Sequence, residues 1–148
     1  YGDTRELHSF PTRRSSDLWV TPPCLEESFR VINAWGFKYK TIGFTWVKRN
    51  KKSRSWFWGL GYWTRANAEL CLIATKGSPK RVNKDVHQIV ESSLGSHSRK
   101  PPEVRDRIVR LMGDIPRIEL FARERNELFD EYEGWDVWGN EIESSIDI

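Results

Sequence analysis

The sequence lacks long apolar runs and contains little cysteine or histidine. Within its 148 residues no stretch reaches the roughly 18 consecutive apolar residues that a membrane-spanning helix needs, and no secretory signal pattern is present. Cys24 and Cys71 stand among apolar residues without the spacing of a metal site. We therefore expect a cytoplasmic protein with buried free thiols, a disulfide or a nucleophilic cysteine being less favoured alternatives. The histidines His8, His87 and His97 are too scattered to form a metal set, so no metal is implied.

Acidic residues are scarce in the middle of the chain and abundant at its end. Residues 37–110 carry 17 Lys or Arg against 5 Asp or Glu, whereas residues 111–148 carry 3 against 11. A basic middle is what a surface that binds a polyanion requires. The acidic end either keeps the fold soluble or marks the side turned away from nucleic acid.

A cationic run precedes a loop rich in glycine and aromatic residues. Lys48 to Arg54 holds five cations in seven residues, and Gly59 and Gly61 allow the next segment to turn sharply and expose its rings. Such a loop is suited to hold a phosphate backbone and to stack an unpaired base. The alternative is a solvated loop with a few aromatics tucked into the core. The candidate nucleic-acid contacts are Arg49, Lys51, Lys52, Arg54, Tyr62, Trp63 and Arg65, with exposed Trp58 beside them.

Short apolar runs alternate with helical periodicity along the chain. Leu25, Phe29, Ile32 and Trp35 share one face of a helix that begins at Pro22 and ends at Gly36. The alternation indicates an α/β protein with a parallel or mixed sheet covered on both faces. We expect strands at 18–20, 37–47, 70–74, 86–90, 115–121 and 135–138, and helices at 22–35 and 101–113.

A set of short segments carries a family resemblance. They are Leu-Trp-Val-Thr-Pro-Pro (18–23), Ala-Trp-Gly-Phe (34–37), Phe-Thr-Trp-Val-Lys (44–48), Gly-Tyr-Trp-Thr-Arg-Ala-Asn followed by Glu-Leu-Cys-Leu (61–72), His-Ser-Arg-Lys-Pro (97–101), Ile-Glu-Leu-Phe-Ala-Arg (118–123) and Gly-Trp-Asp-Val-Trp-Gly-Asn-Glu (134–141). In this order they resemble the MT-A70 family of S-adenosylmethionine-dependent N6-adenine methyltransferases, especially its phage and bacterial members. The resemblance covers about residues 18–142.

The resemblance implies a Rossmann-like methyltransferase fold with an N-terminally truncated sheet, S-adenosyl-L-methionine as cofactor, and adenine in DNA, less favourably RNA, as substrate. Residues 18–142 would form a partial methyltransferase domain and 143–148 a disordered tail. His97 is assigned to loop structure or a substrate-edge contact and not to catalysis. A charge such as Glu119 inside a strand is costly unless paired, so an ion pair is the alternative to a cofactor contact there. The implied cofactor contacts are Lys100, Glu119, Arg123, Asn126, Asn140 and Glu141, with Asn126 the least secure because Glu124-Arg125 departs from the family's usual loop.

The motif that performs methyl transfer in this family is not found in the sequence. Members use Asp-Pro-Pro-Trp, whose acid and backbone carbonyl position the adenine amino group while the aromatic stacks on the base. The Pro-Pro pairs here, Pro22-Pro23 and Pro101-Pro102, have neither the preceding acid nor the following aromatic. No catalytic residue is therefore assigned, and we expect the chain to be an inactive carboxyl-terminal fragment.

The opening residues look foreign to the rest. Residues 1–18 resemble the translation of a sequencing-library adapter, so 1–17 are expected to be a non-native or disordered leader that replaces the lost motif. An ordinary disordered leader is the alternative. Two other functions stay open: a non-catalytic nucleic-acid-binding module that uses loop 48–65, and an α/β domain that binds another protein through its acidic end.

Overall fold

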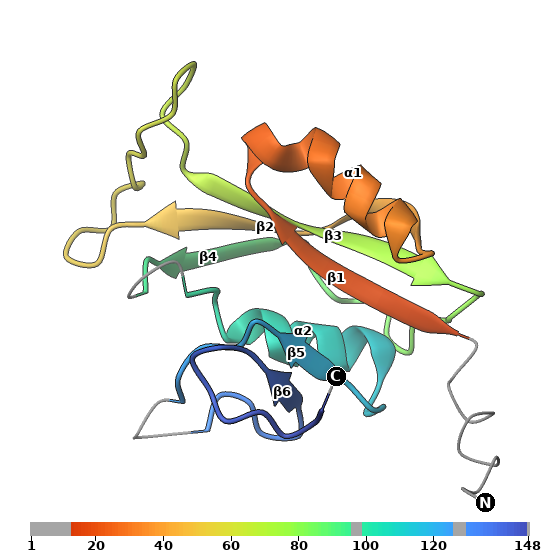
Figure 1. The fold of residues 1–148 in the computed structure, drawn as a ribbon. Helices are drawn as coiled ribbons and strands as arrows, with labels where there is room; N and C mark the ends of the chain where they lie inside the picture. Colours follow the sequence, from red (N-terminus) through yellow and green to blue (C-terminus); the bar gives the residue numbers. More distant parts are fainter. Residues whose placement is uncertain (1–12, 96–98, 126–129, 148) are drawn as a thin grey trace, which may run out of the picture. The chain divides into compact units, whose positions relative to one another are not determined.

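Strand β3 (Ala68–Lys76) lies at the centre of a four-stranded mixed sheet in the computed structural model of the chain, which describes residues 13–95, 99–125 and 130–147. Two neighbours, β1 (Arg14–Val20) and β2 (Lys38–Arg49), run antiparallel to β3 on either side of it. Strand β4 (Ile89–Ser93) pairs in parallel with β2, which gives the order β1-β3-β2-β4 (Figure 1). Because β3 is paired along both sides, its middle residues Cys71 and Leu72 are fully buried.

Helix α1 (Leu25–Ala34) follows a 3-10 turn, η1 (Pro22–Cys24), and packs on this sheet (Figure 1). Ile32 is 2% exposed and packs with Val20 and Leu72, and Leu25 and Phe29 lie around it. The predicted apolar face is therefore confirmed at these three positions. Trp35, predicted on the same face, is 47% exposed because the helix has already ended there.

The described residues divide into two compact units, each described here by itself. The first unit contains the four-stranded sheet with α1, and the second comprises 82–86 and the described residues from 95 onward. The second unit contains α2 (Glu103–Met112) and a two-stranded parallel sheet of β5 (Ile118–Leu120) and β6 (Asp136–Trp138). Its small core is formed by Ala122, Tyr132 and Val137, against which Trp135 and Ile142 pack.

A mixed α/β fold is confirmed, but the strands form two sheets where one was expected. Strand β5 is shorter than predicted because Pro116 has no amide hydrogen for a ladder, and β4 lies three residues later than predicted. Helix α1 packs on the first sheet, while α2 belongs to the second unit, so helices on both faces and a Rossmann-like arrangement stay predictions.

Strand β1 begins at Arg14, so the expectation of no regular structure in residues 1–17 is wrong for residues 14–17. These residues pair with β3 from Ile73 to Lys76, because a strand edge offers backbone partners whatever the side chains are. Residues 1–12 lie outside the described residues. In the tail expected to be disordered, the amide of Ser145 donates to the carbonyl of Val137 at 3.0 Å.

Both cysteines are free thiols. Cys71 is buried as predicted, whereas Cys24 is exposed, because no residue of the 3-10 turn that contains it is buried. Among the described helices, none is long and apolar enough to cross a membrane.

Candidate functional site

The connection between β2 and β3 folds back on itself to form a narrow projection. At its base the amide of Lys48 donates to the carbonyl of Asn67 at 2.8 Å, and the amide of Phe57 donates to the carbonyl of Lys48 at 2.9 Å. Farther out, a Cβ at Gly59 would lie 1.9 Å from the carbonyl oxygen of Ala66, and one at Gly61 equally close to that of Thr64. Only glycine fits such close backbone approach, so these two positions set the width of what we call the finger, residues 58–66.

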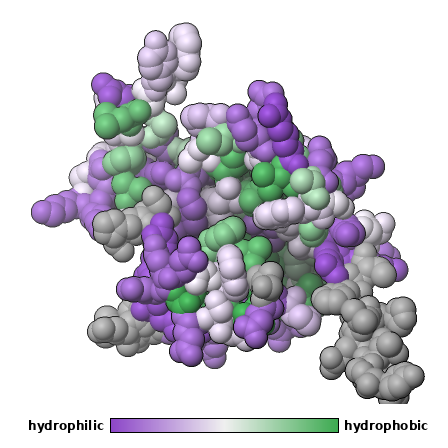
Figure 2. Space-filling view, viewed as in Figure 1, coloured by the Kyte–Doolittle hydropathy of each residue, from purple (hydrophilic) through white to green (hydrophobic). Residues whose placement is uncertain are grey.

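The tip of the finger presents aromatic rings to solvent. Tyr62 is 93% and Trp63 91% exposed, and their rings meet edge to face with centroids 5.4 Å apart. Trp58 is 73% and Leu60 94% exposed. The loop projects beyond the ends of β2 and β3 in Figure 1 and stands out as a pale group at the top of Figure 2. The prediction that the loop exposes its rings is confirmed, and an exposed apolar group of this size indicates a contact site.

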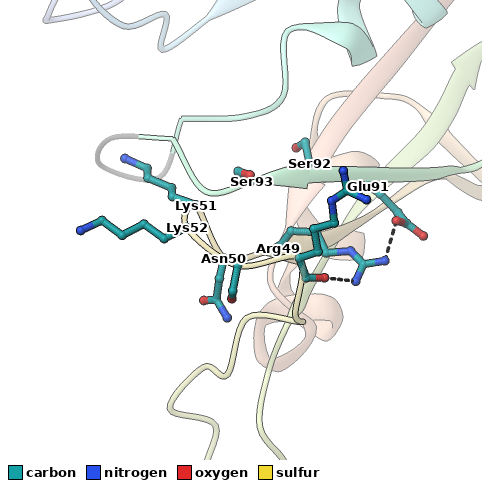
Figure 3. Close-up of a pocket in the computed structure, with 9 residues that line it drawn as sticks. Arg49, Asn50, Lys51, Lys52, Glu91, Ser92 and Ser93 are labelled. Atoms are coloured by element: carbon teal, nitrogen blue, oxygen red, sulfur yellow. Dashed lines mark hydrogen bonds and ion pairs between the residues drawn. The ribbon is translucent and has the colours of Figure 1, made fainter.

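The cationic run forms the wall of a cavity of about 500 Å³. The guanidinium of Arg49 lies 3.4 Å from the ring centroid of Trp56, donates to the carbonyl of Arg54 at 2.6 Å and pairs with Glu91 at 2.8 Å (Figure 3). Lys51 and Lys52 are exposed and extend outward beside it (Figure 3). Arg54 and the finger residue Arg65 are exposed as well. The seven candidate nucleic-acid contacts thus belong to one connection of the first unit.

Lys48, the first cation of the run, faces inward. Its Nζ lies 2.7 Å from Oε1 of Glu69, with side chains 16% and 8% exposed, and 5.0 Å from the centroid of the Trp46 ring. Since Glu69 is the register partner of Trp46 on β3, the pair is built into the β2–β3 ladder. Sequence reasoning missed this pair, although a single acid in an otherwise apolar strand was the available signal.

Glu119 is held in an ion pair in the second unit. Arg105 of α2 donates to both carboxylate oxygens of Glu119, at 3.0 and 2.8 Å, and its guanidinium lies 4.5 Å from the ring centroid of Tyr132. Burial lowers the pKa of Arg105, but hydrogen bonds and charge from Glu119 outweigh it and leave the pKa above its usual value. Burial also raises the pKa of Tyr132. The ion-pair alternative for Glu119 is therefore the one found.

Arg105 and Tyr132 were not found by sequence reasoning. Arg105 is 7% exposed and precedes Ile108 by one helical turn, so it borders the apolar face that Val104 and Ile108 define. An arginine at that spacing was the signal that could have found it. Glu131, with a side chain 1% exposed, pairs with Arg99 at 2.9 Å and adds a second carboxylate near Arg105.

The remaining candidate cofactor contacts are only partly brought together. Nη1 of Arg123 donates to both carboxylate oxygens of Glu141, at 2.9 and 3.0 Å, and its amide donates to the hydroxyl of Tyr132 at 3.0 Å. Asn140 is exposed and Lys100 is half-buried. Asn126 lies outside the described residues.

Fold and site together define a small mixed α/β protein with a cationic, ring-bearing connection and a cluster of paired arginines. The chain belongs to the MT-A70 family, whose model matches residues 9–141. The resemblance seen in the sequence motifs is therefore confirmed.

Similarity to curated proteins points to the same family. The chain is 34% identical over 127 residues to the Type II methyltransferase M.MunI of Mycoplasma sp, covering 84% of this chain and 49% of that protein. It is 31% identical over 128 residues to the N(6)-adenosine-methyltransferase catalytic subunit METTL3 of Homo sapiens, covering 85% of this chain and 21% of that protein. An MT-A70-like N(6)-adenosine-methyltransferase of Arabidopsis thaliana is 32% identical over 127 residues, with 84% and 18% covered. The chain thus spans half or less of each relative.

Proposed function

We propose that this chain is part of an enzyme that transfers a methyl group from S-adenosyl-L-methionine to N6 of adenine, with DNA favoured over RNA. The observation that carries the proposal is the pair of rings at the finger tip above a cationic connection in a member of this family. The preference for DNA rests on the resemblance to phage and bacterial members.

The finger would bind nucleic acid around an extruded base. Taking a base out of a duplex costs a few kcal/mol, and stacking on an aromatic ring returns about 1–3 kcal/mol per base. Tyr62 and Trp63 are exposed enough to supply that stacking. Lys51, Lys52 and Arg54 would bind phosphates, which adds salt-dependent affinity and little sequence preference.

The cofactor would be held by polar groups of the second unit. When bound, S-adenosyl-L-methionine supplies the methyl group as a sulfonium electrophile. Arg123 and Glu141 offer donors and acceptors suited to its polar groups, and their side chains are 40% and 51% exposed. Lys100 would pair with its carboxylate, and Asn126 and Asn140 would lie close by. Glu119 would contribute through a carboxylate whose orientation Arg105 fixes.

We further propose that these 148 residues alone do not transfer methyl groups, and that residues 1–17 are not native to the fold. Acid, backbone carbonyl and aromatic of Asp-Pro-Pro-Trp are what aim the amino nitrogen, and the sequence contains no such motif. Resequencing the gene across codons 1–20 tests the origin of the leader. A contiguous genomic reading of the present codons would disprove a non-native start.

Isothermal titration with S-adenosyl-L-methionine tests the methyltransferase proposal. We expect binding by a chain in which an upstream segment carrying Asp-Pro-Pro-Trp has been restored, and weaker binding by the same chain with Arg123→Gln. Arg30→Gln, an equally exposed arginine of α1, is the matched control and should leave binding unchanged. Absence of cofactor binding by the restored chain would end the proposal.

A second candidate is a nucleic-acid-binding module without catalysis. It is favoured by the fact that loop 48–65 carries the rings and cations on residues independent of the missing motif. Oligonucleotide binding by the restored chain that is unaffected by S-adenosyl-L-methionine, together with no methyl incorporation into adenine, would favour this candidate.

A further inference from the structure

The cavity beside the β2–β3 connection is lined by hydrophilic residues throughout. Ligand pockets for drug-sized molecules are lined mainly by hydrophobic and aromatic side chains. This cavity instead combines four cations with one carboxylate, an asparagine and three serines, so it suits a small anion better than a base or an apolar group. The lining residues are Arg49, Asn50, Lys51, Lys52, Ser53, Arg54, Glu91, Ser92 and Ser93 (Figure 3).

Arg49 is the cation whose position is fixed. Stacking on Trp56 and the hydrogen bond to the carbonyl of Arg54 orient its guanidinium, and its side chain is 28% exposed. An oriented guanidinium loses little freedom when it binds a phosphate with parallel hydrogen bonds. In the structure Nη2 of Arg49 donates to Glu91, so a carboxylate oxygen accepts the hydrogen bond that a phosphate oxygen would accept (Figure 3).

Ser92 adds a neutral donor to the same cavity. Its hydroxyl is buried and has no hydrogen-bond partner within the described part of the chain. Its carbonyl accepts from Nε1 of Trp46 at 3.3 Å, which holds this end of β4 against β2. Buried hydroxyls without a partner are rare in folded proteins, and an anion in the cavity would accept from this one.

We propose that this cavity binds one phosphate group of the nucleic acid, and that Glu91 competes with that phosphate for Arg49. The inference rests on the nucleic-acid binding proposed above. Arg49 and Ser92 would hold the phosphate directly, while Lys51 and Lys52 attract the strand from outside. Glu91 keeps Arg49 oriented in the free protein and lowers its affinity for phosphate, which limits binding to nonspecific polyanions.

The first test measures binding of a short fluorescein-labelled single-stranded oligonucleotide by anisotropy at several salt concentrations. Glu91→Gln should tighten binding several-fold and steepen the dependence of log K on log salt by about one unit, because Arg49 gains a phosphate contact. Glu27→Gln is the matched control: it removes the same charge from an exposed position on α1 of the same unit. Equal effects of the two substitutions would overturn the competition.

A double-substitution cycle locates the effect at Arg49. In an Arg49→Met background Glu91→Gln should no longer tighten binding, since the competing pair is gone. A gain that persists there would overturn the proposal. Ser92→Ala, a substitution too small to unfold the strand end, should weaken binding without changing the salt slope. Unchanged affinity for Ser92→Ala would show that the hydroxyl does not donate to phosphate.

Inorganic phosphate, followed by phosphorus NMR, separates this proposal from the proposed function. If phosphate binds in a way that Glu91→Gln strengthens, but no oligonucleotide binds, the cavity stands as a site for free phosphate and the nucleic-acid function fails. If oligonucleotides bind but Glu91→Gln changes neither their affinity nor the phosphate signal, the phosphate site fails and the nucleic-acid function stands.

Discussion

The two units of the chain use their cations in opposite ways. In the first unit Lys51, Lys52 and Arg54 are exposed and form no ion pair within the described part of the chain. In the second unit Arg105 is buried with Glu119, and Arg123 pairs with Glu141. A buried charge must be satisfied by the protein itself, whereas an exposed one stays free for a polyanion. Position decides whether a cation serves the fold or a partner, and composition alone does not.

Replacing the buried arginine should give the largest effect. Arg105→Met leaves two partly or fully buried carboxylates without their guanidinium, and we expect the second unit to lose about 3–5 kcal/mol of stability. Urea unfolding, with hydrogen exchange of the β5 amides as the local readout, measures the loss. Arg110→Met, which removes an exposed arginine paired with Asp85 on the same helix, is the control and should have a far smaller effect. Equal stability of the two variants would remove the contrast between the units.

Reversing the exposed lysines should abolish binding and leave the fold intact. Lys51→Glu with Lys52→Glu removes two phosphate contacts, which corresponds to about a 100-fold loss of affinity near 50 mM salt and a salt slope lower by about two. Anisotropy with labelled DNA measures both quantities. Lys38→Glu with Lys40→Glu, at the opposite end of β2, is the matched control. Affinity and slope that stay at the wild-type values would show that the connection does not contact DNA.

Removing the rings should act on single strands specifically. Tyr62→Ala with Trp63→Ala should weaken binding of single-stranded DNA about tenfold through lost stacking, with no change in salt slope. Leu60→Ala removes an exposed apolar side chain from the same finger but no ring, so it should leave affinity unchanged. If the ring-free variant and the Leu60 variant bind equally well, stacking is not the role of the finger.

The smallest effect is expected at the start of β1. Asp17 is partly buried opposite Ile73, and burial raises its pKa from 3.8 to about 7. The folded state therefore binds the proton more tightly than the unfolded chain, so stability is highest below pH 4 and falls as pH rises from 4 to about 7. Asp17→Asn should gain stability over that window, by about 1 kcal/mol at neutral pH, whereas exposed Glu27→Gln should not.

Thermal unfolding at a series of pH values measures both Asp17→Asn and its control. A difference between the two curves that does not grow between pH 4 and 7 would contradict the assignment. An acid that destabilises its own strand at neutral pH is also what a segment foreign to the fold would bring, so the result bears on the origin of residues 1–17.

Local signals predicted the elements well where one force dominated. The helix around Ile32 and the strand around Leu72 follow from apolar spacing and flanking glycine, and both lie where expected. The exposed rings of the finger follow from Gly59 and Gly61, which the sequence displays directly. The family follows from motifs whose order is specific.

Long-range pairing was not predictable in the same way. The division of the strands into two sheets depends on which edges meet, and no local pattern records that choice. The ion pairs of Arg105 with Glu119 and of Lys48 with Glu69 join residues that are 14 and 21 positions apart. The sequence showed each charge, but only the fold shows which charge neutralises which.

The pinched neck of the finger separates its tip from the sheet. Backbone hydrogen bonds at Lys48 and close approach at Gly59 and Gly61 hold the stem without using any side chain of residues 62–65. Those positions are therefore free to diversify while the scaffold stays constant. A change of target in a descendant of this protein would need only new letters at the tip, much as an interchangeable bit changes what a fixed tool can grip.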